Sequence, residues 1–475
     1  MAEQKTGGRK NLRAAGIYVL LVVAPVLLAI VLLTGAHGHS AAVTTAKVVA
    51  GHPLAQLLLA VAAVVGACKA AGWLMRRIGQ PPVVGEIVAG IVLGPSVLGA
   101  VWPAGAAAII PKEVVPQLNV VAQLGVVLFV FLTGLELNTR LLKGRGHLAV
   151  VVSHVSIAVP FLLGITLAGL AYTKFAPKGV GFLAFALFFG VSMSVTALPV
   201  LIRILKDIGL FRSEVGVVAL TCALVDDVTA WSLLALVVAL VTASSMTGVL
   251  FTLALTAVFI AALFLVIRPL LNRLVTRVNP GKLRSFAPLA LVAVLLCAMA
   301  TEWIGVHAMF GAFLFGMIFP RGNVIETWLH EKAGGLTTAL MLPLFFAYSG
   351  LRTNIRLIGA DPTLWLWCAA ILVVAVAGKL GGSALAARAV GENWNRSLQV
   401  GTLMNCRGLT ELVVLNVGLD LGVLSQTMFT MLVIMALVST AMAAPMAAWF
   451  ARRDGQNIVV GEFLNDELRA ARTAA

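Results

Sequence analysis

The sequence predicts an all-α polytopic membrane protein of 13–14 transmembrane helices, at roughly 20 residues per crossing, folded as an inverted repeat with two crossed broken helices. Three observations predict this fold class. The 475-residue chain is 60% hydrophobic and only 11% charged, with a mean hydropathy of +1.03, values far outside those of soluble globular domains. Long apolar runs follow one another at short intervals. Two pairs of short motifs also recur seven runs apart, as described below.

The apolar runs can be read as fourteen candidate spans, each long enough to cross about 30 Å of hydrocarbon. They are 14–34, 54–75, 83–100, 116–137, 147–171, 181–203, 214–241, 247–268, 285–303, 305–320, 334–351, 362–388, 397–419 and 426–450. The first run has a basic flank and could instead be a signal peptide cleaved near His39 and Ser40. Because the run exceeds the usual apolar length of a signal peptide, we expect a membrane anchor.

The charge distribution predicts the orientation of these spans. The formal net charge is +15, and with the N-terminus inside the cell most of the 34 Lys and Arg residues fall in cytoplasmic segments, as the positive-inside rule requires. We therefore expect both termini to be cytoplasmic, and we do not attribute the basic surplus to nucleic-acid binding. Three basic residues remain within spans: Lys69, Lys379 and Arg407. Lys69 can snorkel toward the cytoplasmic end of its helix, whereas Lys379 and Arg407 cannot.

No enzyme motif or cofactor site is apparent in the sequence. The five cysteines lie in apolar runs without CxxC or paired spacing: Cys68, Cys222, Cys297, Cys368 and Cys406. The chain has no convincing phosphate loop, serine-hydrolase elbow or zinc pattern. We therefore expect neither a membrane-embedded enzyme nor a bound cofactor.

An internal repeat relates the two halves of the chain. FLTGLELN (131–138) closes the fourth span and AYSGLRTN (347–354) closes the eleventh, while AGIVLGP (89–95) and GAFLFGMIFP (311–320) occupy the third and tenth. Because seven is an odd offset, the two copies must cross the membrane in opposite directions. Such inverted repeats are characteristic of secondary transporters. The predicted organisation is a tail, extra helix and outer loop (1–53), a transporter domain (54–451) and a short cytoplasmic tail (452–475), with repeats at about 54–241 and 285–451 and a linker helix at 247–268.

The sixth and thirteenth spans correspond in this repeat, and both carry signs of a broken helix. GVSMSVTALPV (190–200) contains Ser194, Thr196 and Pro199, and GTLMNCRGLTEL (401–412) has no continuous apolar face. Proline removes a backbone donor and clashes with the preceding turn. Unwound backbone would expose carbonyl groups that can bind a cation near the bilayer midplane.

Asp226 and Asp227 lie side by side in the seventh span, in ALVDDVTAW. A carboxylate at bilayer depth is costly and indicates a functional site, and two adjacent carboxylates cannot both ionise cheaply. Lys379 lies at a similar depth, where pairing with one of the two aspartates would preserve its charge. Neighbouring helical residues point about 100° apart, so spacing does not decide which aspartate faces Lys379. For Arg407 we expect Glu411, at i,i+4, to be the local partner.

These motifs resemble those of the monovalent cation:proton antiporter-2 superfamily, especially its plant CHX-type cation/H+ exchangers and bacterial relatives. The resemblance rests on SVTALPVLIRIL (194–205), ALVDDVTAWSLLAL (223–236), GVHAMFGAFLFGMIFP (305–320), VAGKLGG (376–382) and NCRGLTELVVLNVGLD (405–420). It covers about 54–451. It implies the sodium/proton antiporter fold, a homodimer with a scaffold domain and a mobile core that moves like an elevator, and no organic cofactor.

By this resemblance Asp227 matches the ion-binding aspartate, and Asp226 matches the preceding position, which many plant exchangers fill with Asn. The two-aspartate form resembles bacterial electrogenic Na+/H+ antiporters, in which the first aspartate pairs with the lysine matched here by Lys379. The chain stops about 25 residues after its last span. The regulatory domain of glutathione-gated relatives and the long tail of plant members are therefore not expected.

The sequence as a whole predicts a plasma-membrane Na+/H+ antiporter. Asp227 would bind protons and a dehydrated monovalent cation in turn, with Thr196, Ser194 and broken-helix carbonyls nearby. K+/H+ exchange is the alternative within transport. A cation channel, an accessory membrane receptor and an exporter of a charged organic compound are further alternatives, which proton-coupled cation flux would separate from exchange.

Overall fold

The computed structural model describes residues 53–136, 146–211, 213–242, 246–277 and 284–455. The first expected span, 14–34, and the tail beyond 455 lie outside these residues. Within the described ranges every regular element is a helix, and eleven helices are long and apolar enough to cross a membrane. The predicted class, an all-α polytopic membrane protein, is confirmed.

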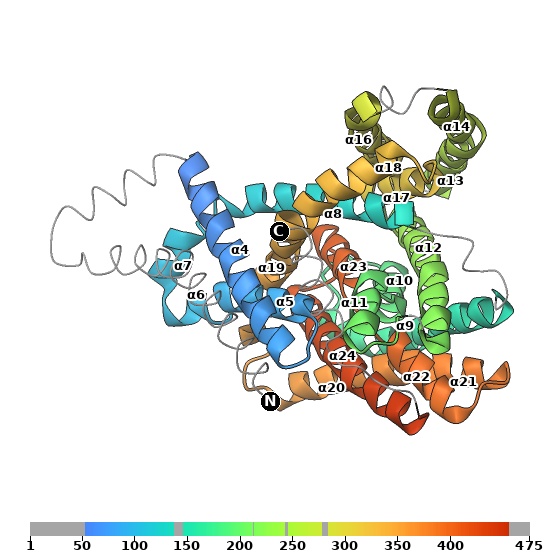
Figure 1. Ribbon diagram of the computed structural model, residues 1–475. Coiled ribbons are helices and arrows are strands. Elements are labelled where there is room, and N and C mark those ends of the chain that lie inside the picture. Colours follow the sequence, from blue (N-terminus) through green and yellow to red (C-terminus); the bar gives the residue numbers. More distant parts are fainter. Residues whose placement is uncertain (1–52, 137–145, 212, 243–245, 278–283, 456–475) are drawn as a thin grey trace, which may run out of the picture.

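The helices follow the expected order of spans from residue 54 onward (Figure 1). In the first half they are α4 (Pro53–Arg77), α5 (Pro82–Leu93), α6 (Leu98–Val101), α7 (Pro103–Ile109), α8 (Val115–Glu136), α9 (Gly146–Phe175), α10 (Phe182–Ser194), α11 (Leu198–Asp207) and α12 (Glu214–Thr242). In the middle they are α13 (Met246–Ala262), η3 (Leu263–Ile267), α14 (Arg268–Arg277), η4 (Arg284–Phe286) and α16 (Ala287–Ile304).

The remaining helices form the second half of the chain. It contains α17 (Ala308–Ile318), α18 (Val324–Trp328), η5 (Leu329–Gly334), η6 (Thr337–Met341), α19 (Leu342–Arg352), η7 (Ile355–Leu357), α20 (Pro362–Val376), η8 (Ala377–Gly381), α21 (Gly382–Ala389), α22 (Trp394–Met404), α23 (Leu409–Asp420) and α24 (Gln426–Arg453). The tenth expected span is the short helix α17. The thirteenth is the pair α22 and α23, which is interrupted in the middle.

The eleventh span starts earlier than its hydropathy indicates. The expectation was 334–351, but the helical rod begins at Val324 and continues through α18, η5 and η6 into α19. Asn323 caps its start by accepting hydrogen bonds from the backbone N–H groups of Ile325 and Glu326, which is the usual role of Asn at a helix N-terminus. The first turns carry charged residues such as Glu331 and Lys332, so a hydropathy window misses them.

The helices pack as two bundles, which we name by their contacts. In the core bundle, α9 to α12 pack on one another and on α20 to α24. In the scaffold bundle, α4, α5, α8, α16, α17 and α19 pack together, and α13 lies against α16. The core bundle therefore combines 146–242 with 362–453, and the scaffold bundle combines 53–136 with 246–352. Each bundle takes one part from each half of the sequence.

Glycine contacts in the scaffold bundle support the inverted repeat. A Cβ atom on Gly350 of α19 would collide with the backbone of α5 at Ile87 and Gly90. A Cβ atom on Gly134 of α8 would collide in the same way with the backbone of α17 at Phe313 and Gly316. Gly134 and Gly350 hold the same position in FLTGLELN and AYSGLRTN. Exchanging the halves of the chain therefore converts one helix pair into the other, and small residues permit both close approaches.

Candidate functional site

The two broken helices cross in the core bundle. The first breaks between α10 and α11, and the second between α22 and α23. At the crossing the backbone N–H of Ala197 donates to the carbonyl of Cys406 over 3.0 Å, which joins the two unwound segments directly. Pro199 stands in the first turn of α11, where its missing N–H costs no helical hydrogen bond.

Two buried cations bind the end of α10. The last carbonyls of a helix have no partner within the helix, and its C-terminal end carries partial negative charge. Arg407 donates from Nη1 to the Ser192 carbonyl (2.9 Å) and from Nη2 to the Met193 carbonyl (2.7 Å). Lys379 donates to the Ser194 carbonyl. The charged side chains that the sequence places at mid-membrane depth thus stabilise an interrupted helix.

Lys379 belongs to a π-helical turn, η8, which lies between α20 and α21. Such turns occur mostly as single insertions and frequently lie at functional sites. Gly378 and Gly382 flank the lysine and face α9, where Cβ atoms on them would lie 3.1 Å from Pro160 and Val159. Close packing against α9 leaves the Lys379 side chain fully buried.

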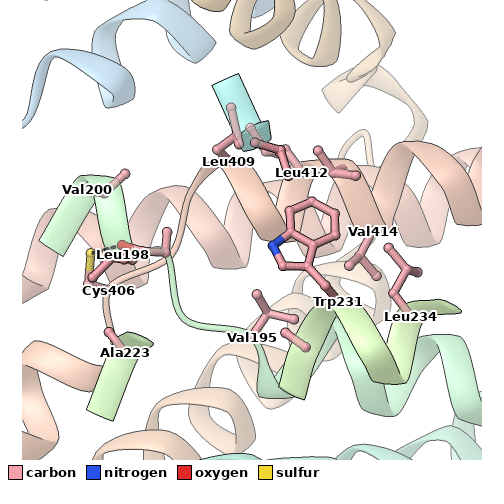
Figure 2. Close-up of a cluster of buried hydrophobic side chains, with 14 of the residues drawn as sticks. Val195, Leu198, Val200, Ala223, Trp231, Leu234, Cys406, Leu409, Leu412 and Val414 are labelled. Carbon is pink, nitrogen blue, oxygen red and sulfur yellow. Dashed lines mark hydrogen bonds between the residues drawn. The ribbon is translucent and has the colours of Figure 1, made fainter. Parts of the chain in front are cut away.

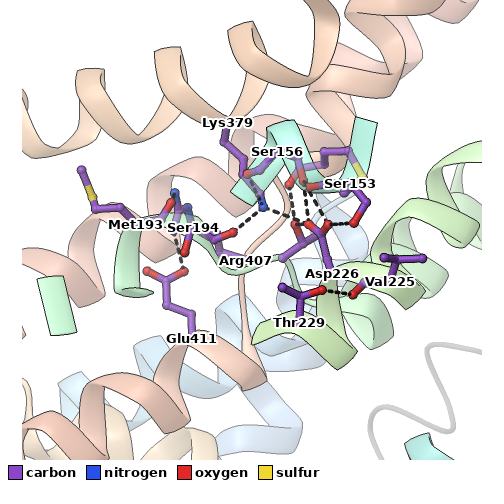
Figure 3. Close-up of polar contacts among 12 residues, drawn as sticks. Ser153, Ser156, Met193, Ser194, Val225, Asp226, Thr229, Lys379, Arg407 and Glu411 are labelled. Carbon is purple, nitrogen blue, oxygen red and sulfur yellow. Dashed lines mark hydrogen bonds and ion pairs between the residues drawn. The ribbon is translucent and has the colours of Figure 1, made fainter. Parts of the chain in front are cut away.

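Asp226 is held by several donors (Figure 3). Lys379 Nζ lies 3.0 Å from its Oδ2, and Thr196 Oγ1 donates to the same oxygen over 2.7 Å. Ser153 Oγ donates to Oδ1 over 2.5 Å, and Ser156 Oγ lies 3.0 and 2.8 Å from the two oxygens. A carboxylate has about four lone-pair sites, so these donors nearly saturate the Asp226 carboxyl group and fix its orientation.

The neighbouring carboxylate of Asp227 is in a different environment. Its side chain is only 1% exposed, yet its Oδ1 has no hydrogen-bond partner among the described residues. The amide oxygen of Asn405, at the second helix break, is likewise buried without a partner in the described part of the chain. Buried oxygens without donors are costly, but carboxylate and carbonyl oxygens are the ligands that hard cations prefer. The oxygens around the crossing are therefore of the kind that binds hard cations.

Arg407 also forms an ion pair with Glu411, one turn along α23. Arg407 Nη1 and Glu411 Oε2 are 3.3 Å apart and both side chains are fully buried. Neither Glu411 oxygen has a hydrogen-bond partner within the described ranges, so this ion pair lacks hydrogen-bond geometry. The carboxylate also lies in the first turn of α23, where the helix dipole favours negative charge. Thr440 of α24 exchanges two hydrogen bonds with the Arg407 backbone and so holds the unwound segment in place.

Trp231 covers the site on one side. It lies one turn beyond Asp227 on α12 and is 3% exposed. Figure 2 shows its ring among Val195 of the first helix break and Leu409 and Leu412 of α23. Its ring centroid is 6.4 Å from that of Phe313 in α17, so Trp231 also connects the core bundle to the scaffold bundle. Apolar packing here excludes water from the turn next to Asp227.

The structure decides which aspartate faces Lys379, a point that the spacing left open, and it contains the contact expected between Arg407 and Glu411. Lys379 contacts Asp226. The role expected for Thr196 at a cation bound by Asp227 stays a prediction, because its hydroxyl group lies on Asp226 here. Ser194 contributes its carbonyl group to Lys379, whereas its own hydroxyl donates to Val191.

Sequence reasoning missed Ser153 and Ser156, which both bind Asp226. They stand three residues apart in the fifth expected span and share a helix face. That spacing was the available signal. It is weak, because small polar residues also mediate ordinary packing between membrane helices.

Comparison with known proteins places this geometry among ion exchangers. A family model described as "Sodium/hydrogen exchanger, transmembrane" matches residues 59–453. The Na(+)/H(+) antiporter NhaS4 of Synechocystis sp. is 40% identical over 393 residues, covering 82% of this chain and 96% of that protein. Cation/H(+) antiporter 17 of Arabidopsis thaliana is 37% identical, covering 83% of this chain and 48% of the relative.

A fungal relative and a solved structure complete the comparison. K(+)/H(+) antiporter 1 of Saccharomyces cerevisiae is 35% identical, covering 77% of this chain and 43% of the relative. The chain thus spans about half the length of the plant and yeast proteins. The sodium proton antiporter MjNhaP1 from Methanocaldococcus jannaschii has a TM-score of 0.63 and 12% identity, covering 84% of this chain and 98% of that one. At this identity the likeness concerns the fold alone.

Proposed function

This chain belongs to the sodium/hydrogen exchanger family, and we propose that it is a secondary active transporter that exchanges Na+ for protons by alternating access. The observation that carries the proposal is the contrast between the adjacent carboxylates. Asp226 is nearly saturated by donors, whereas Asp227 is buried with an oxygen that no group in the described residues binds. Asp226 can therefore stabilise the fold, while Asp227 is available to bind the transported ions.

Asp227 is the group at which Na+ and H+ compete. Its carboxylate can carry a proton or contact a cation, and the two occupants exclude each other. That exclusion couples the fluxes. The oxygens of Thr196 and Asn405 and the carbonyl groups of the helix breaks are the further ligands available to the cation. Asp226 and Lys379 neutralise each other, so the charge that changes during the cycle is the one on Asp227.

The two bundles supply the moving parts. In this proposal the core bundle carries the site past a scaffold bundle that forms the homodimer. The protein lies in the plasma membrane with both termini in the cytoplasm. The positive-inside rule supports this orientation, because one end of the bundles carries basic residues: Arg76, Arg388 and Arg452 at the ends of α4, α21 and α24, and Arg268 at the start of α14. We call this the basic end.

K+ is the second candidate cation. The 35% identity to a protein named K(+)/H(+) antiporter 1 favours it, whereas the match covering nearly all of NhaS4 favours Na+. Everted membrane vesicles that hold a pH gradient distinguish the two. Li+, Na+, K+ and Rb+ are added in turn, and we expect Na+ to collapse the gradient at the lowest concentration. A collapse by K+ at a lower concentration than Na+ would assign the second candidate.

The test of the site is Asp227→Asn in reconstituted vesicles. We expect exchange to fall at least tenfold, about 1.4 kcal/mol in barrier terms, because an amide cannot exchange a proton for a cation. Asp361→Asn is the matched control, since Asp361 is exposed and caps α20 and Asn caps helices equally well. If Asp227→Asn retains more than half of wild-type exchange, Asp227 is not the ion site. Cation flux that leaves the pH gradient intact under voltage clamp would instead indicate a channel.

A further inference from the structure

The ends of α19 and α23 are joined by polar contacts between the scaffold bundle and the core bundle. Arg352 Nη2 lies 2.7 Å from Asp420 Oδ1, and Arg352 Nη1 donates to Asn416 Oδ1 over 3.0 Å. Asn416 Nδ2 in turn donates to Ser349 Oγ over 2.8 Å. Gln426, at the start of α24, donates to the Arg352 carbonyl. We refer to Ser349, Arg352, Asn416, Asp420 and Gln426 as the latch.

The latch lies at the end of the molecule opposite the basic end, because α19 and α23 finish there and α24 begins there. The Arg352 guanidinium also lies 5.8 Å from the ring centroid of Phe429 in α24. Its side chain is only 18% exposed. The Asp420 side chain is 42% exposed, so the ion pair is shielded from water mainly on the Arg352 side. An ion pair that is partly shielded and supported by further hydrogen bonds is stronger than an ordinary surface pair.

The inverted repeat gives Arg352 a counterpart at the basic end. Arg352 follows Gly350 by two residues, as Glu136 follows Gly134 in the equivalent motif. Glu136 Oε1 lies 3.8 Å from Nδ1 of His330, and both residues belong to the scaffold bundle. A cavity of about 650 Å³ opens beside them, lined also by Arg268, Arg321 and Glu326. Arg352 thus contacts the core bundle at the latch end, whereas the equivalent residue Glu136 contacts its own scaffold bundle at the basic end.

We propose that the latch closes the extracellular side of the transporter in this state, and that Arg352 and Asp420 are positioning residues whose contact sets the balance between inward-facing and outward-facing conformations. The inference rests on the proposed function and orientation. Moving the core bundle relative to α19 changes the distance between Arg352 and Asp420, so the pair must break before the site can open outward. A contact that forms in only one of two states stabilises that state, and the free energy of the contact sets how far the populations shift toward it.

Removing the latch should make the outward-facing state more populated. For a partly shielded ion pair we expect the ratio of the two states to change about three- to tenfold. The apparent KM for the cation should then rise at the cytoplasmic face and fall at the extracellular face. A residue that only supported the fold would lower the amount of active protein without moving the two KM values in opposite directions.

The experiment uses Arg352→Gln and Asp420→Asn in the full-length chain. Spin labels at Trp303→Cys in α16 and Leu421→Cys beside α23 report the distance between the bundles, because both positions are exposed at the latch end. Arg356→Gln is the matched control, since Arg356 is exposed and lies one turn along the same segment. KM values come from everted and right-side-out vesicles.

We expect a second distance population in both latch variants, opposite KM shifts at the two faces, and neither effect in Arg356→Gln. Exchanging the charges, with Arg352→Asp and Asp420→Arg together, should restore at least half of the wild-type distance population. Unchanged distances in Arg352→Gln and Asp420→Asn would overturn the latch while leaving exchange intact. A distance shift in a protein that exchanges no cation for protons would retain the latch and reject the proposed function.

Discussion

Replacing Lys379 by Met tests how the centre of the core bundle is held together. The substitution keeps an unbranched side chain of similar volume but removes the three contacts of Nζ, which are to Asp226 Oδ2 (3.0 Å), the Ser156 carbonyl (3.0 Å) and the Ser194 carbonyl. Each orphaned buried carbonyl costs about 1–3 kcal/mol, and the carboxylate loses its counter-ion. Removing one member of a buried pair typically costs 3–5 kcal/mol. We therefore expect Lys379→Met to lower the free energy of unfolding by about 3–5 kcal/mol.

The companion change Asp226→Asn should offset part of this loss. Once Asp226 is neutral, no uncompensated charge remains, while hydroxyl groups such as those of Ser153 and Thr196 stay beside the amide. We expect the double variant to lose at least about 2 kcal/mol less unfolding free energy than the two single variants lose in sum, since residues in contact show coupling energies of about 0.5–3 kcal/mol.

The measurement is a double-mutant cycle on the free energy of unfolding, obtained by titrating SDS into mixed micelles and following helix content by circular dichroism. Lys69→Met is the control, because Lys69 is a half-buried lysine of α4 outside the site, and we expect it to change stability by no more than about 0.5 kcal/mol. Additive effects of Lys379→Met and Asp226→Asn, within about 0.5 kcal/mol, would refute the reasoning.

Three further predictions follow from buried contacts. Arg407→Lys should slow exchange at least tenfold, about 1.4 kcal/mol, because an ammonium group lacks the planar fork that binds the Ser192 and Met193 carbonyls together. The rate of cation flux into vesicles measures this effect. If the double variant Arg407→Ala, Glu411→Ala kept wild-type flux, both residues would be structural. Gly316→Val should destabilise the scaffold bundle by about 1–3 kcal/mol, because its Cβ would collide with the Phe131 carbonyl. Gly335→Ala is the control, since a Cβ atom at Gly335 would meet open space. Equal midpoints of SDS unfolding for the two variants would contradict the packing argument. Trp231→Ala should cost about 3–5 kcal/mol and Trp231→Phe less than half of that, as read from thermal melting, and a tolerated Ala would show that the ring does not fill the crossing.

The sequence by itself determined the fold class, the order of the spans and the positions of both helix breaks. These features depend on properties that local sequence carries directly, namely the hydropathy of runs long enough to cross a bilayer and the helix-breaking chemistry of Pro199 and the polar segment at 401–412. The same reasoning selected Asp226, Asp227, Lys379 and Arg407, because a charge at bilayer depth is conspicuous in any chain. It placed the start of the eleventh span about ten residues too late, since charged turns hide a helix from a hydropathy window.

The spacing of the residues did not decide which aspartate pairs with Lys379; the family resemblance implied Asp226, and the tertiary structure contains that contact. Two adjacent residues on a helix differ by about 100° in direction, and nothing in the sequence fixes how α12 is rotated toward η8. The π-helical turn that carries Lys379 and the serines of α9 that bind Asp226 are likewise products of packing. The latch depends on the same level of organisation, because Arg352 and Asp420 are 68 residues apart in the chain and meet only when the core bundle packs against the scaffold bundle. The sequence specifies which groups must be buried, and the packing of the helices determines which of them come into contact.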